Sequence, residues 1–326
     1  MDEKILRLLK EQSPGFLSGE EIGRLLSISR TAVWKRVRGL KALGYEIEAT
    51  TRSGYRLIRS ADLLTPAEVG PGLKTAWMGK KIHHFGALDS TNSTAYQLAM
   101  EGAGEGELVI AESQGKGRGR LGREWFSPPF LNLYLSVILR PKIPPQQASL
   151  ITLMAAVATS DAIEKFSGLH PTIKWPNDIL MDSRKVAGLL NEIHSETDRV
   201  HFVVLGIGVN LNVSREEMPE EIRKLATSLK EEMGQAVSRK AFLQGLLSEV
   251  ERWYSVFLKE GGSAILKAWG ERARIEGRTV KVSSFGETVT GTAVGVDPYG
   301  ALILRTRTGE RKRVVAGDIQ YKSRKS

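Results

Sequence analysis

The order of secondary-structure patterns in about the first sixty residues constrains the fold of this chain more than any other feature. Apolar side chains at positions 5–9 have helical spacing, and Pro14-Gly15 ends that segment. Ser18 and Glu21 form a capping-box pattern that predicts the start of a second helix. After a short break at residues 27–29 a third helical pattern begins, so the chain opens with three short helices.

The third helical pattern has an apolar face and a basic face, and two short strands follow it. Its inner face carries Val33, Val37 and Leu40. Its other face carries polar and basic side chains, namely Arg30, Thr31, Trp34, Lys35 and Arg38. Residues 45–50 and 54–58 are predicted to be strands, with a turn at residues 51–54. Three helices followed by a hairpin are the order of a winged helix-turn-helix.

This arrangement predicts DNA binding. In a winged helix-turn-helix the third helix enters the major groove, and the hairpin contacts the backbone or the minor groove. Residues 29–59 contain eight Lys or Arg and two Glu, a net charge of +6 on the elements that would face phosphate. Base contacts are predicted from Arg30, Thr31 and Trp34. Phosphate contacts are predicted from Lys35, Arg38 and Arg52. The alternative is a small helical protein-interaction module with a solvated basic face.

The composition excludes several classes of chemistry for the chain as a whole. There is no cysteine, which excludes disulfides, thiolate metal sites and cysteine nucleophiles. The 326 residues exceed the usual size of one domain, and 41% of them are hydrophobic, which is enough to form packed cores. The net charge of +10 favours contact with a polyanion or with anionic substrates. The five histidines show no metal-ligand spacing, so no metal site is predicted.

The sequence has neither the pattern of a membrane span nor that of a signal peptide. The N-terminus runs directly into a polar helical pattern. The most apolar stretch, residues 148–163, is interrupted by hydroxyl side chains and by Asp161. A bilayer core of ~30 Å needs about 20 apolar residues. We therefore expect a buried helix at this stretch, no membrane contact and a cytoplasmic protein.

Strand and helix patterns mix in the central part of the chain, which predicts an α/β or α+β domain of enzyme size. The apolar, β-branched runs are at residues 107–113, 131–139, 186–194 and 200–211. The helical patterns are at residues 91–100, 145–166 and 238–259.

The sharpest motif is the segment Gln114–Arg123, in which four glycines are interleaved with four basic residues. The glycines allow the backbone to approach a ligand closely, and the cations supply charge for a phosphate or a carboxylate. Although Gly117, Gly119 and Gly122 match the letters of a dinucleotide fingerprint, that fingerprint must open a helix. The two prolines in residues 124–129 forbid one, and the segment contains no Gly-Lys-Ser/Thr Walker sequence. The alternative is a flexible basic surface loop.

Four further segments carry polar groups suited to a compact ligand or a nucleotide. Residues 89–94 offer hydroxyls and an amide for a polar ring, although a plain helix N-cap uses the same residue types. Residues 174–178 end a strand with a cation, an amide and a carboxylate, and residues 184–188 begin the next strand, which suits a hairpin returning to one site. Residues 206–212 have glycines where a ligand or another backbone passes closely. Each segment alone also fits ordinary turn chemistry.

This set of motifs closely resembles that of the biotin–protein ligases, and the head is similar to that of the bifunctional members that also repress the biotin operon. The resemblance runs through nearly the whole chain. The Gly-Arg-Gly-Arg segment 117–120 and the Lys-Trp-Pro-Asn-Asp segment 174–178 are highly specific to the family, although lipoate ligases share the related catalytic fold. The resemblance implies an α+β multidomain protein. Its domains would be a winged helix-turn-helix DNA-binding domain (1–62), a class II synthetase-like α/β ligase domain with a mixed sheet (63–273) and an SH3-like β-barrel (274–326).

The resemblance implies a biotin–protein ligase, also called biotin–acetyl-CoA-carboxylase ligase. Such an enzyme uses ATP to activate biotin as biotinyl-5'-AMP and transfers it to a specific lysine of a biotin carboxyl carrier protein. Adenylation brings two anions together, so cations and backbone N–H donors are needed around the developing charge. No side-chain nucleophile is required, which fits a chain without cysteine. Mg²⁺ is expected as a partner of ATP rather than in a protein cage.

The family roles carry over to this sequence motif by motif. Biotin is expected to be bound by Ser90, Thr91, Asn92, Gln114, Gly117, Arg118, Gly119, Arg120, Lys185, Gly188 and Gly206. The nucleotide is expected to be bound by Arg120, Arg123, Trp125, Lys174, Asn177, Asn210 and Lys322. Catalytic roles are expected for Lys185, Arg118, Arg120 and Asp178. Lys185 would lie between the biotin carboxylate and the phosphate, Trp125 would stack on adenine, and Asp178 would orient the incoming lysine or act as a general base.

The C-terminal segment changes character again, into short strands separated by turns. Strands are predicted at residues 280–282, 289–296, 302–305 and 312–315. This pattern suggests a small β-barrel, and the resemblance implies an SH3-like one. In the family a C-terminal arginine contributes to the nucleotide site, whereas this sequence has Lys322 there, which keeps the charge but loses the bidentate fork.

The resemblance also implies a switch, in which biotinyl-5'-AMP orders the glycine-rich loop and favours a homodimer that spans two operator half-sites. Three alternatives stay open at this point. The first is a non-enzymatic repressor of biotin synthesis genes whose C-terminal part only senses biotin. The second is a lipoate ligase. The third is a monofunctional ligase with a vestigial head, which would bind DNA only by weak, salt-sensitive attraction.

Overall fold

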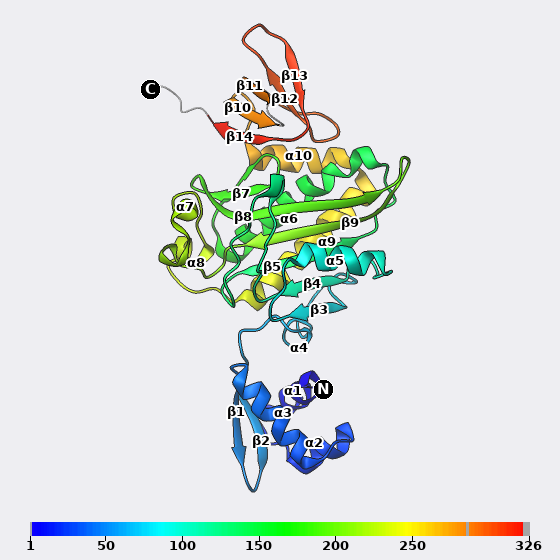
Figure 1. The fold of residues 1–326 in the computed structure, drawn as a ribbon, viewed down its shortest axis with the longest axis vertical. Helices are drawn as coiled ribbons and strands as arrows, with labels where there is room; N and C mark the ends of the chain where they lie inside the picture. Colours follow the sequence, from blue (N-terminus) through cyan, green and yellow to red (C-terminus); the bar gives the residue numbers. More distant parts are fainter. Residues whose placement is uncertain (1, 285–286, 322–326) are drawn as a thin grey trace. The chain divides into compact units, whose positions relative to one another are not determined.

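The computed structural model describes residues 2–284 and 287–321, which form two compact units (Figure 1). The first unit reaches to Leu73 and the second begins at Lys74. Within these ranges no helix combines the length and the apolar character that crossing a membrane requires.

The first unit has the predicted order of three helices and a hairpin, followed by a short fourth helix. Its elements are α1 (Asp2–Glu11), α2 (Gly19–Leu26), α3 (Arg30–Ala42), β1 (Glu46–Thr50), β2 (Gly54–Arg59) and α4 (Pro66–Val69). The Ser18 hydroxyl accepts the Glu21 amide N–H at 3.0 Å, and Ser29 caps α3 in the same way through Ala32 at 3.2 Å. These caps satisfy backbone donors that a helix leaves unpaired in its first turn.

One apolar cluster holds the first unit together. Its members come from α1, α2, α3 and both strands, and they include Ile5, Leu9, Ile22, Val33, Val37, Leu40, Ile47 and Leu57. Leu17 pairs with Tyr55 as an additional rung beside the hairpin. Because α3 turns its apolar stripe into this cluster, its basic face stays exposed. The predicted winged helix-turn-helix order is confirmed.

The second unit is built on a seven-stranded mixed sheet in the order β3-β4-β5-β9-β8-β7-β6. Its strands are β3 (Ile82–Phe85), β4 (Leu108–Ala111), β5 (Leu133–Leu139), β6 (Thr172–Lys174), β7 (Asp178–Met181), β8 (Arg184–Ser195) and β9 (Val200–Val209). Strands β3 and β4 are parallel, and all other neighbours are antiparallel. The mixed sheet is as predicted.

Helices pack against this sheet in two groups. Helix α5 (Thr91–Met100) contacts β4, β5 and β9. Helix α6 (Ser149–Ser167) contacts β6 to β9 and lies behind β8 and β9 in Figure 1, and α9 (Arg239–Glu260) and α10 (Gly262–Ala273) pack against it. Nearly every side chain of α6 between Leu150 and Ile163 is buried, which confirms the buried helix predicted from the apolar stretch. The remaining helical segments are α7 (Glu220–Arg223), α8 (Leu229–Met233) and the 3-10 turns Arg120–Gly122, Pro145–Gln147 and Arg215–Glu217.

The C-terminal strands form a separate five-stranded antiparallel sheet in the order β13-β12-β11-β10-β14. They are β10 (Thr279–Ser284), β11 (Glu287–Val296), β12 (Leu302–Arg305), β13 (Arg311–Val314) and β14 (Asp318–Tyr321). The Trp175 indole N–H donates to the Gly300 carbonyl at 3.0 Å and ties this sheet to the central domain. Within the described residues β13 and β14 do not pair with each other, so an antiparallel β domain is confirmed and a closed barrel is not.

Candidate active site

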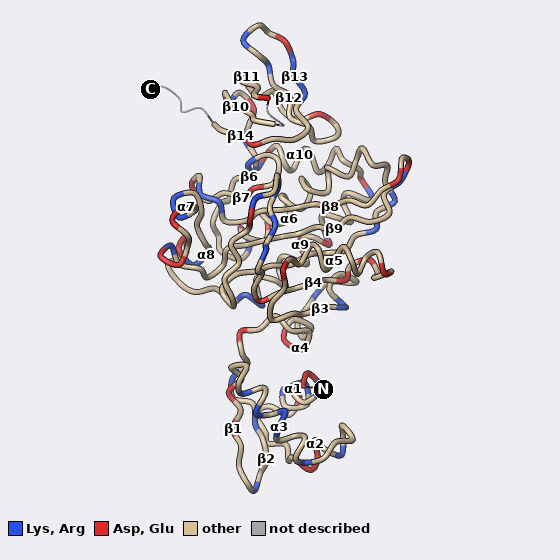
Figure 2. Tube along the Cα trace, in the orientation of Figure 1, with Lys and Arg blue, Asp and Glu red and all other residues tan. Residues whose placement is uncertain are grey.

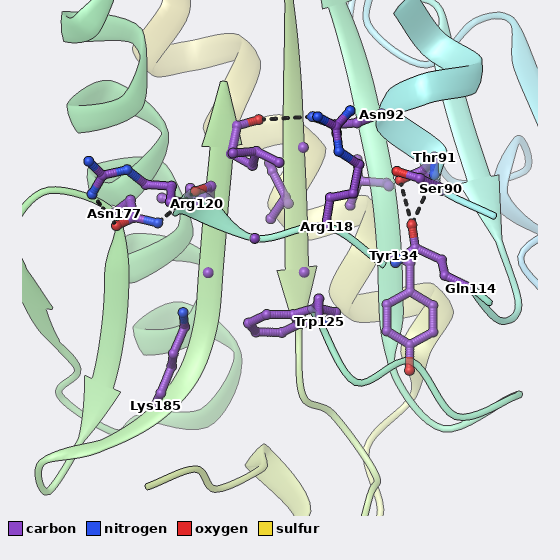
Figure 3. Close-up of a pocket in the computed structure, with 18 residues that line it drawn as sticks. Ser90, Thr91, Asn92, Gln114, Arg118, Arg120, Trp125, Tyr134, Asn177 and Lys185 are labelled. Atoms are coloured by element: carbon purple, nitrogen blue, oxygen red, sulfur yellow. Dashed lines mark hydrogen bonds between the residues drawn. The ribbon is translucent and has the colours of Figure 1, made fainter. Parts of the chain in front are cut away.

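A cleft lies on the central sheet, bordered by α5, the glycine-rich loop and the β7–β8 hairpin (Figure 3). Most of the residues expected at the biotin and nucleotide sites line it. They are Ser90, Thr91, Asn92, Gln114, Arg118, Gly119, Arg120, Trp125, Asn177, Lys185, Gly188 and Gly206. The fold thus gathers into one cleft segments that are far apart in the sequence.

The floor of the cleft is made by aligned positions on neighbouring strands. One cross-strand row consists of Tyr134, Gly208, Gly188 and Asp178. The next row consists of Ser136, Gly206 and Leu190. A Cβ atom on Gly206 would stand 2.1 Å from the Asn92 Oδ1 atom, and one on Gly208 would stand 2.6 Å from the Trp125 ring. Only glycine fits beneath these side chains. The glycines predicted a close neighbour at these positions, and the structure places the side chains of Asn92 and Trp125 there.

The start of α5 forms a polar wall at one end of the cleft (Figure 3). The backbone N–H and the hydroxyl of Thr91 both donate to Gln114 Oε1, at 2.9 and 3.2 Å. The Gln114 amide nitrogen donates to the Ser127 hydroxyl at 3.0 Å. Because a backbone N–H can only donate, the Thr91 contact fixes which side of the Gln114 amide faces α5. Ser90, Thr91 and Asn92 are each 4% exposed, so this wall is largely withdrawn from water.

Arg118 and Glu192 lie at the same end as Asn92. The Arg118 Nη1 atom is 2.8 Å from Glu192 Oε1, and the Asn92 amide nitrogen donates to Glu192 Oε2 at 2.9 Å. Glu192 was missed by the sequence reasoning, which stopped at Gly188 in this strand. The alternation of side chains along β8 from Gly188 through Leu190 was the available signal, because it puts residue 192 on the same face.

Lys185 and Asp178 meet across the β7–β8 hairpin at the other end of the cleft. The Lys185 Nζ and Asp178 Oδ1 atoms are 2.6 Å apart, so the predicted hairpin does return to one site. Lys185 Nζ also lies 5.1 Å from the centroid of the Trp125 ring. The Trp125 indole nitrogen is buried and has no hydrogen-bond partner among the described residues. A ligand acceptor would satisfy this donor.

Two arginines of the glycine-rich loop reach the C-terminal sheet. Arg120 donates to Asn177 Oδ1 at 3.2 Å and to the Gly317 carbonyl at 3.4 Å. Arg123 forms an ion pair with Asp318 at the start of β14. Burial lowers the pKa of the Arg120 guanidinium from its usual value. The C-terminal sheet therefore borders the end of the cleft where Asn177 and Lys185 lie.

Several expected site residues stand outside the lining of the cleft, namely Gly117, Arg123, Lys174, Asp178 and Asn210. Burial lowers the pKa of the Lys174 ammonium group, and the negative charge of Asp178 opposes that shift. The Asn210 amide donates to the Thr227 carbonyl at 2.9 Å, so it is used to hold the backbone. Lys322 lies outside the described residues.

Two polar residues of β5 were also missed. The Ser136 hydroxyl is 2.9 Å from Thr91 Oγ1 and 2.6 Å from Asn92 Oδ1, and Tyr134 lines the cleft. Burial raises the pKa of the Tyr134 hydroxyl above its usual value. The apolar run Leu133–Leu139 concealed both residues, although their spacing of two along a strand puts them on one face.

The histidines have side-chain partners outside the cleft, as His83 has in Glu107 and His84 in Glu112, both at 2.8 Å. Glu112 also pairs with the buried Arg239 at 2.8 Å, which makes His84 part of the scaffold. In the part of the chain that the structure describes, no group of three or more His, Cys, Asp or Glu side chains is arranged to hold a metal ion.

The first unit presents its predicted DNA-contacting side chains to solvent. All six are exposed: Arg30, Thr31, Trp34, Lys35, Arg38 and Arg52. The Arg38 guanidinium lies 4.8 Å from the centroid of the Trp34 ring, one helical turn away on α3. Figure 2 shows basic residues along α3 and at the tip of the β1–β2 hairpin. These are the two elements that a winged helix-turn-helix turns toward DNA.

Three family models match the chain. The model of the HTH domain matches residues 2–56, that of the Biotin/lipoate A/B protein ligase family matches residues 85–210, and that of the Biotin protein ligase C terminal domain matches residues 277–321. Together they span both units and the C-terminal sheet.

The chain is similar over almost its whole length to proteins of two bacteria. It is 39% identical over 316 residues to the bifunctional ligase/repressor BirA of Bacillus subtilis, covering 97% of both chains. It is 30% identical over 311 residues to BirA of Escherichia coli, covering 94% of both chains. Among solved structures, biotin protein ligase from Aquifex aeolicus in complex with biotin and ATP is similar with a TM-score of 0.63 and 28% identity, covering 74% of this chain and 99% of that chain.

Proposed function

The chain belongs to the biotin protein ligase family, among its bifunctional ligase/repressor members, and from this premise we propose which of its residues serve each activity. As a member it couples biotin to a lysine of a biotin carboxyl carrier protein with ATP, through biotinyl-5'-AMP, and it represses transcription of biotin biosynthesis genes in response to biotin. Biotin and ATP are its substrates, and Mg²⁺ accompanies ATP.

The contrast between the two ends of the cleft carries the proposal. One end has neutral hydrogen-bonding groups on α5 and Gln114 beside the ion pair of Arg118 with Glu192, and the other has the cations Lys185 and Arg120. Biotin has the matching pattern, because its ureido ring is neutral and its carboxylate is anionic. The ring therefore binds at Ser90, Thr91, Asn92 and Gln114. The carboxylate points toward Lys185.

In the first step a carboxylate oxygen attacks the α-phosphorus of ATP, and pyrophosphate leaves. Lys185 and Arg120 stabilise the negative charge that builds up between the two anions. In the second step the lysine amine of the carrier protein attacks the carbonyl carbon of the anhydride, and AMP leaves. Asp178, 2.6 Å from Lys185, holds that ammonium group in position and accepts a proton from the incoming amine.

The nucleotide binds at the end of the cleft that the C-terminal sheet borders. Asn177 and the unpaired indole N–H of Trp125 offer polar contacts to the adenylate, and the Trp125 ring stacks on adenine. Arg123 and Lys174 take the charge of the leaving pyrophosphate. Lys322 replaces the arginine that the family uses at its C-terminus.

The head supplies the repressor activity. Arg30, Thr31 and Trp34 read bases, and the exposed cations Lys35, Arg38 and Arg52 contact phosphates. Biotinyl-5'-AMP acts as corepressor: it favours a homodimer whose two heads reach two operator half-sites. The exposed basic face of α3 supports this assignment.

The finer architecture follows the family pattern as well. The domains are a DNA-binding head (1–62), a class II synthetase-like ligase domain (63–273) and an SH3-like C-terminal domain (274–326). The register shift of β11 between Ala293 and Gly295 supports such a domain, because a bulge bends its strand. The chain acts in the cytoplasm, where its substrates and operator DNA are found.

The test of the enzyme assignment is exchange of labelled pyrophosphate into ATP, with biotin and with lipoate as the acid. Exchange with biotin alone is expected, because the α5 wall is built for a ring with N–H donors and a carbonyl acceptor. Exchange with lipoate at a comparable rate would contradict the assignment of the wall. Absence of exchange with both acids would overturn the ligase assignment.

A further inference from the structure

We propose that Glu192 is a positioning residue: it orients the hydrogen-bonding groups and balances the charge at the biotin end of the cleft. The inference rests on the proposed function, because it takes the α5 wall to be the ureido-binding end. Glu192 does this by holding two groups at once, the amide of Asn92 and the guanidinium of Arg118.

The geometry makes Glu192 a shared partner of the α5 wall and of the glycine-rich loop. Its Oε2 atom accepts from the Asn92 amide at 2.9 Å, and its Oε1 atom is 2.8 Å from Arg118 Nη1. The Glu192 side chain is 22% exposed and that of Arg118 is 50% exposed. Glu192 lies on β8 opposite Val204, one same-face row beyond Gly206. Its carboxylate therefore marks the end of the cleft floor on this side. One carboxylate thus connects α5, the glycine-rich loop and the sheet.

Glu192, together with the Leu190 carbonyl that accepts from the same nitrogen at 3.3 Å, decides which face of the Asn92 amide the ligand meets. An ionised carboxylate only accepts hydrogen bonds, so the amide nitrogen must turn toward Glu192 and the oxygen away from it. That oxygen accepts from the Ser136 hydroxyl at 2.6 Å and lies over Gly206 on the cleft floor. Its second lone pair is an acceptor for a ligand N–H. A ureido ring has two such donors, so Glu192 makes the wall complementary to it.

The contact with Arg118 decides the charge of this end. Paired with Glu192, the guanidinium adds no net charge beside the ring. At the other end Asp178 balances Lys185, but Arg120 donates to the neutral Asn177 amide and Gly317 carbonyl, so a net attraction for a carboxylate remains there. Without Glu192 a cation would stand at both ends of the cleft, and the biotin carboxylate would be attracted to the wrong one. The ion pair therefore favours one orientation of biotin over the reverse.

The test is the substitution Glu192→Gln, which keeps the size of the side chain, removes its charge and replaces the shorter of the two acceptors of the Asn92 amide nitrogen by an amide that can also donate. In biotin-dependent pyrophosphate exchange the KM for biotin is expected to rise at least tenfold, while kcat and the KM for ATP stay within threefold of the wild type. The affinity for biotin, measured by titration of biotin into the full chain, should fall by the same factor. A KM for biotin in Glu192→Gln within twofold of the wild-type value would overturn the proposal.

Two controls separate this role from general support of the fold or the loop. Asp318→Asn removes the carboxylate partner of another arginine of the same loop, Arg123, and should leave the KM for biotin unchanged. Glu196→Gln removes an exposed carboxylate at the far end of β8 and should change nothing. If Asp318→Asn raised the KM for biotin as much as Glu192→Gln does, tethering of the loop would explain the effect and the proposal would fail.

A double-substitution cycle tests whether Glu192 acts through Asn92. In an Asn92→Ala background the further change Glu192→Gln should raise the KM for biotin less than threefold. If the two residues acted independently, the fold-changes of the two substitutions would multiply. If Glu192→Gln does not fold, as judged by thermal unfolding, Glu192→Asp carries the same prediction because it withdraws the carboxylate by one methylene. Failure of the wild type to exchange pyrophosphate with biotin would instead overturn the proposed function.

Discussion

The cations of the two units are presented in opposite ways. In the head the proposed DNA-contacting cations are exposed, and within the described residues none forms an ion pair with a carboxylate; they are Arg30, Lys35, Arg38 and Arg52. Four of the cations proposed for the active site are each held by a partner. Those pairs are Arg118 with Glu192, Lys185 with Asp178, Arg120 with Asn177, and Arg123 with Asp318.

The difference follows from the charge that each surface must meet. A DNA backbone is an extended polyanion, and summed positive charge attracts it through counterion release, so mobile unpaired cations suffice. A carboxylate attacking a phosphate develops its charge at one point. A cation that stabilises that point must already be oriented, and a hydrogen-bonding partner provides the orientation. The cleft is therefore expected to be sensitive to its carboxylates, and the head to its total charge.

The largest effect should come from removing the central cation of the cleft. Lys185→Ala should lower kcat for pyrophosphate exchange on the order of 10²–10³-fold, which is the loss expected when one oriented donor at a developing charge is removed. The matched control is Lys116→Ala in the glycine-rich loop, since Lys116 is 78% exposed and, among the described residues, forms an ion pair only with the exposed Asp89. A loss below tenfold for Lys185→Ala, or equal losses for both variants, would contradict the view that oriented cations in the cleft matter more than exposed ones.

A smaller effect is expected from the partner of that cation. Asp178→Asn should lower kcat between about ten- and a hundredfold, because Lys185 keeps its charge but loses the carboxylate 2.6 Å away. If Asp178 also takes the proton of the incoming lysine, transfer to the carrier protein should fall further than pyrophosphate exchange does. Single-turnover transfer from preformed adenylate measures this difference. The control Asp89→Asn should leave both rates within twofold.

Effects comparable to that of Asp178→Asn, or smaller, are expected in the head, one side chain at a time. Lys35→Ala should weaken binding to operator and to random DNA alike and reduce the salt slope of log K by about 1, whereas Arg30→Ala should cost about 1–3 kcal/mol on the operator alone. Binding titrations at several salt concentrations separate the two. Both variants should exchange pyrophosphate at the wild-type rate. A change in exchange would mean that the two sets of cations are not independent.

Local signals predicted the parts of the fold that depend on residues close in sequence. The cap Ser18 was readable because a cap bonds an amide three residues ahead, at 3.0 Å here; Ser29, which the sequence analysis treated only as part of a break, caps α3 in the same way at 3.2 Å. The glycine-rich loop was readable as a non-helical ligand loop because two prolines follow it. The β7–β8 hairpin was readable because its strands are separated by a short turn, and it brings Lys185 to Asp178.

Other features of the site had no local signal. Ser136 stands within an apolar run and becomes part of the site only because β5 pairs with β9 in a register that sets it beside Gly206. Glu192 resembles any solvated strand residue until the loop brings Arg118 to it from 74 positions earlier, 192 minus 118, at 2.8 Å. The border made by Gly317 and Asp318 of the C-terminal sheet likewise depends on a contact between distant segments.

The sequence by itself determined the order of the domains, the helix starts, the glycine-rich loop and the residue types at the reacting centre. These depend on caps, turns and periodicity, whose interactions span a few residues and are encoded where they act. Only the tertiary structure decided which carboxylate holds which arginine and which glycines align into the floor of the cleft. Strand pairing and ion pairs join residues that are far apart in the sequence. Their free energy depends on the packing of the whole domain, so a short stretch of sequence does not determine them.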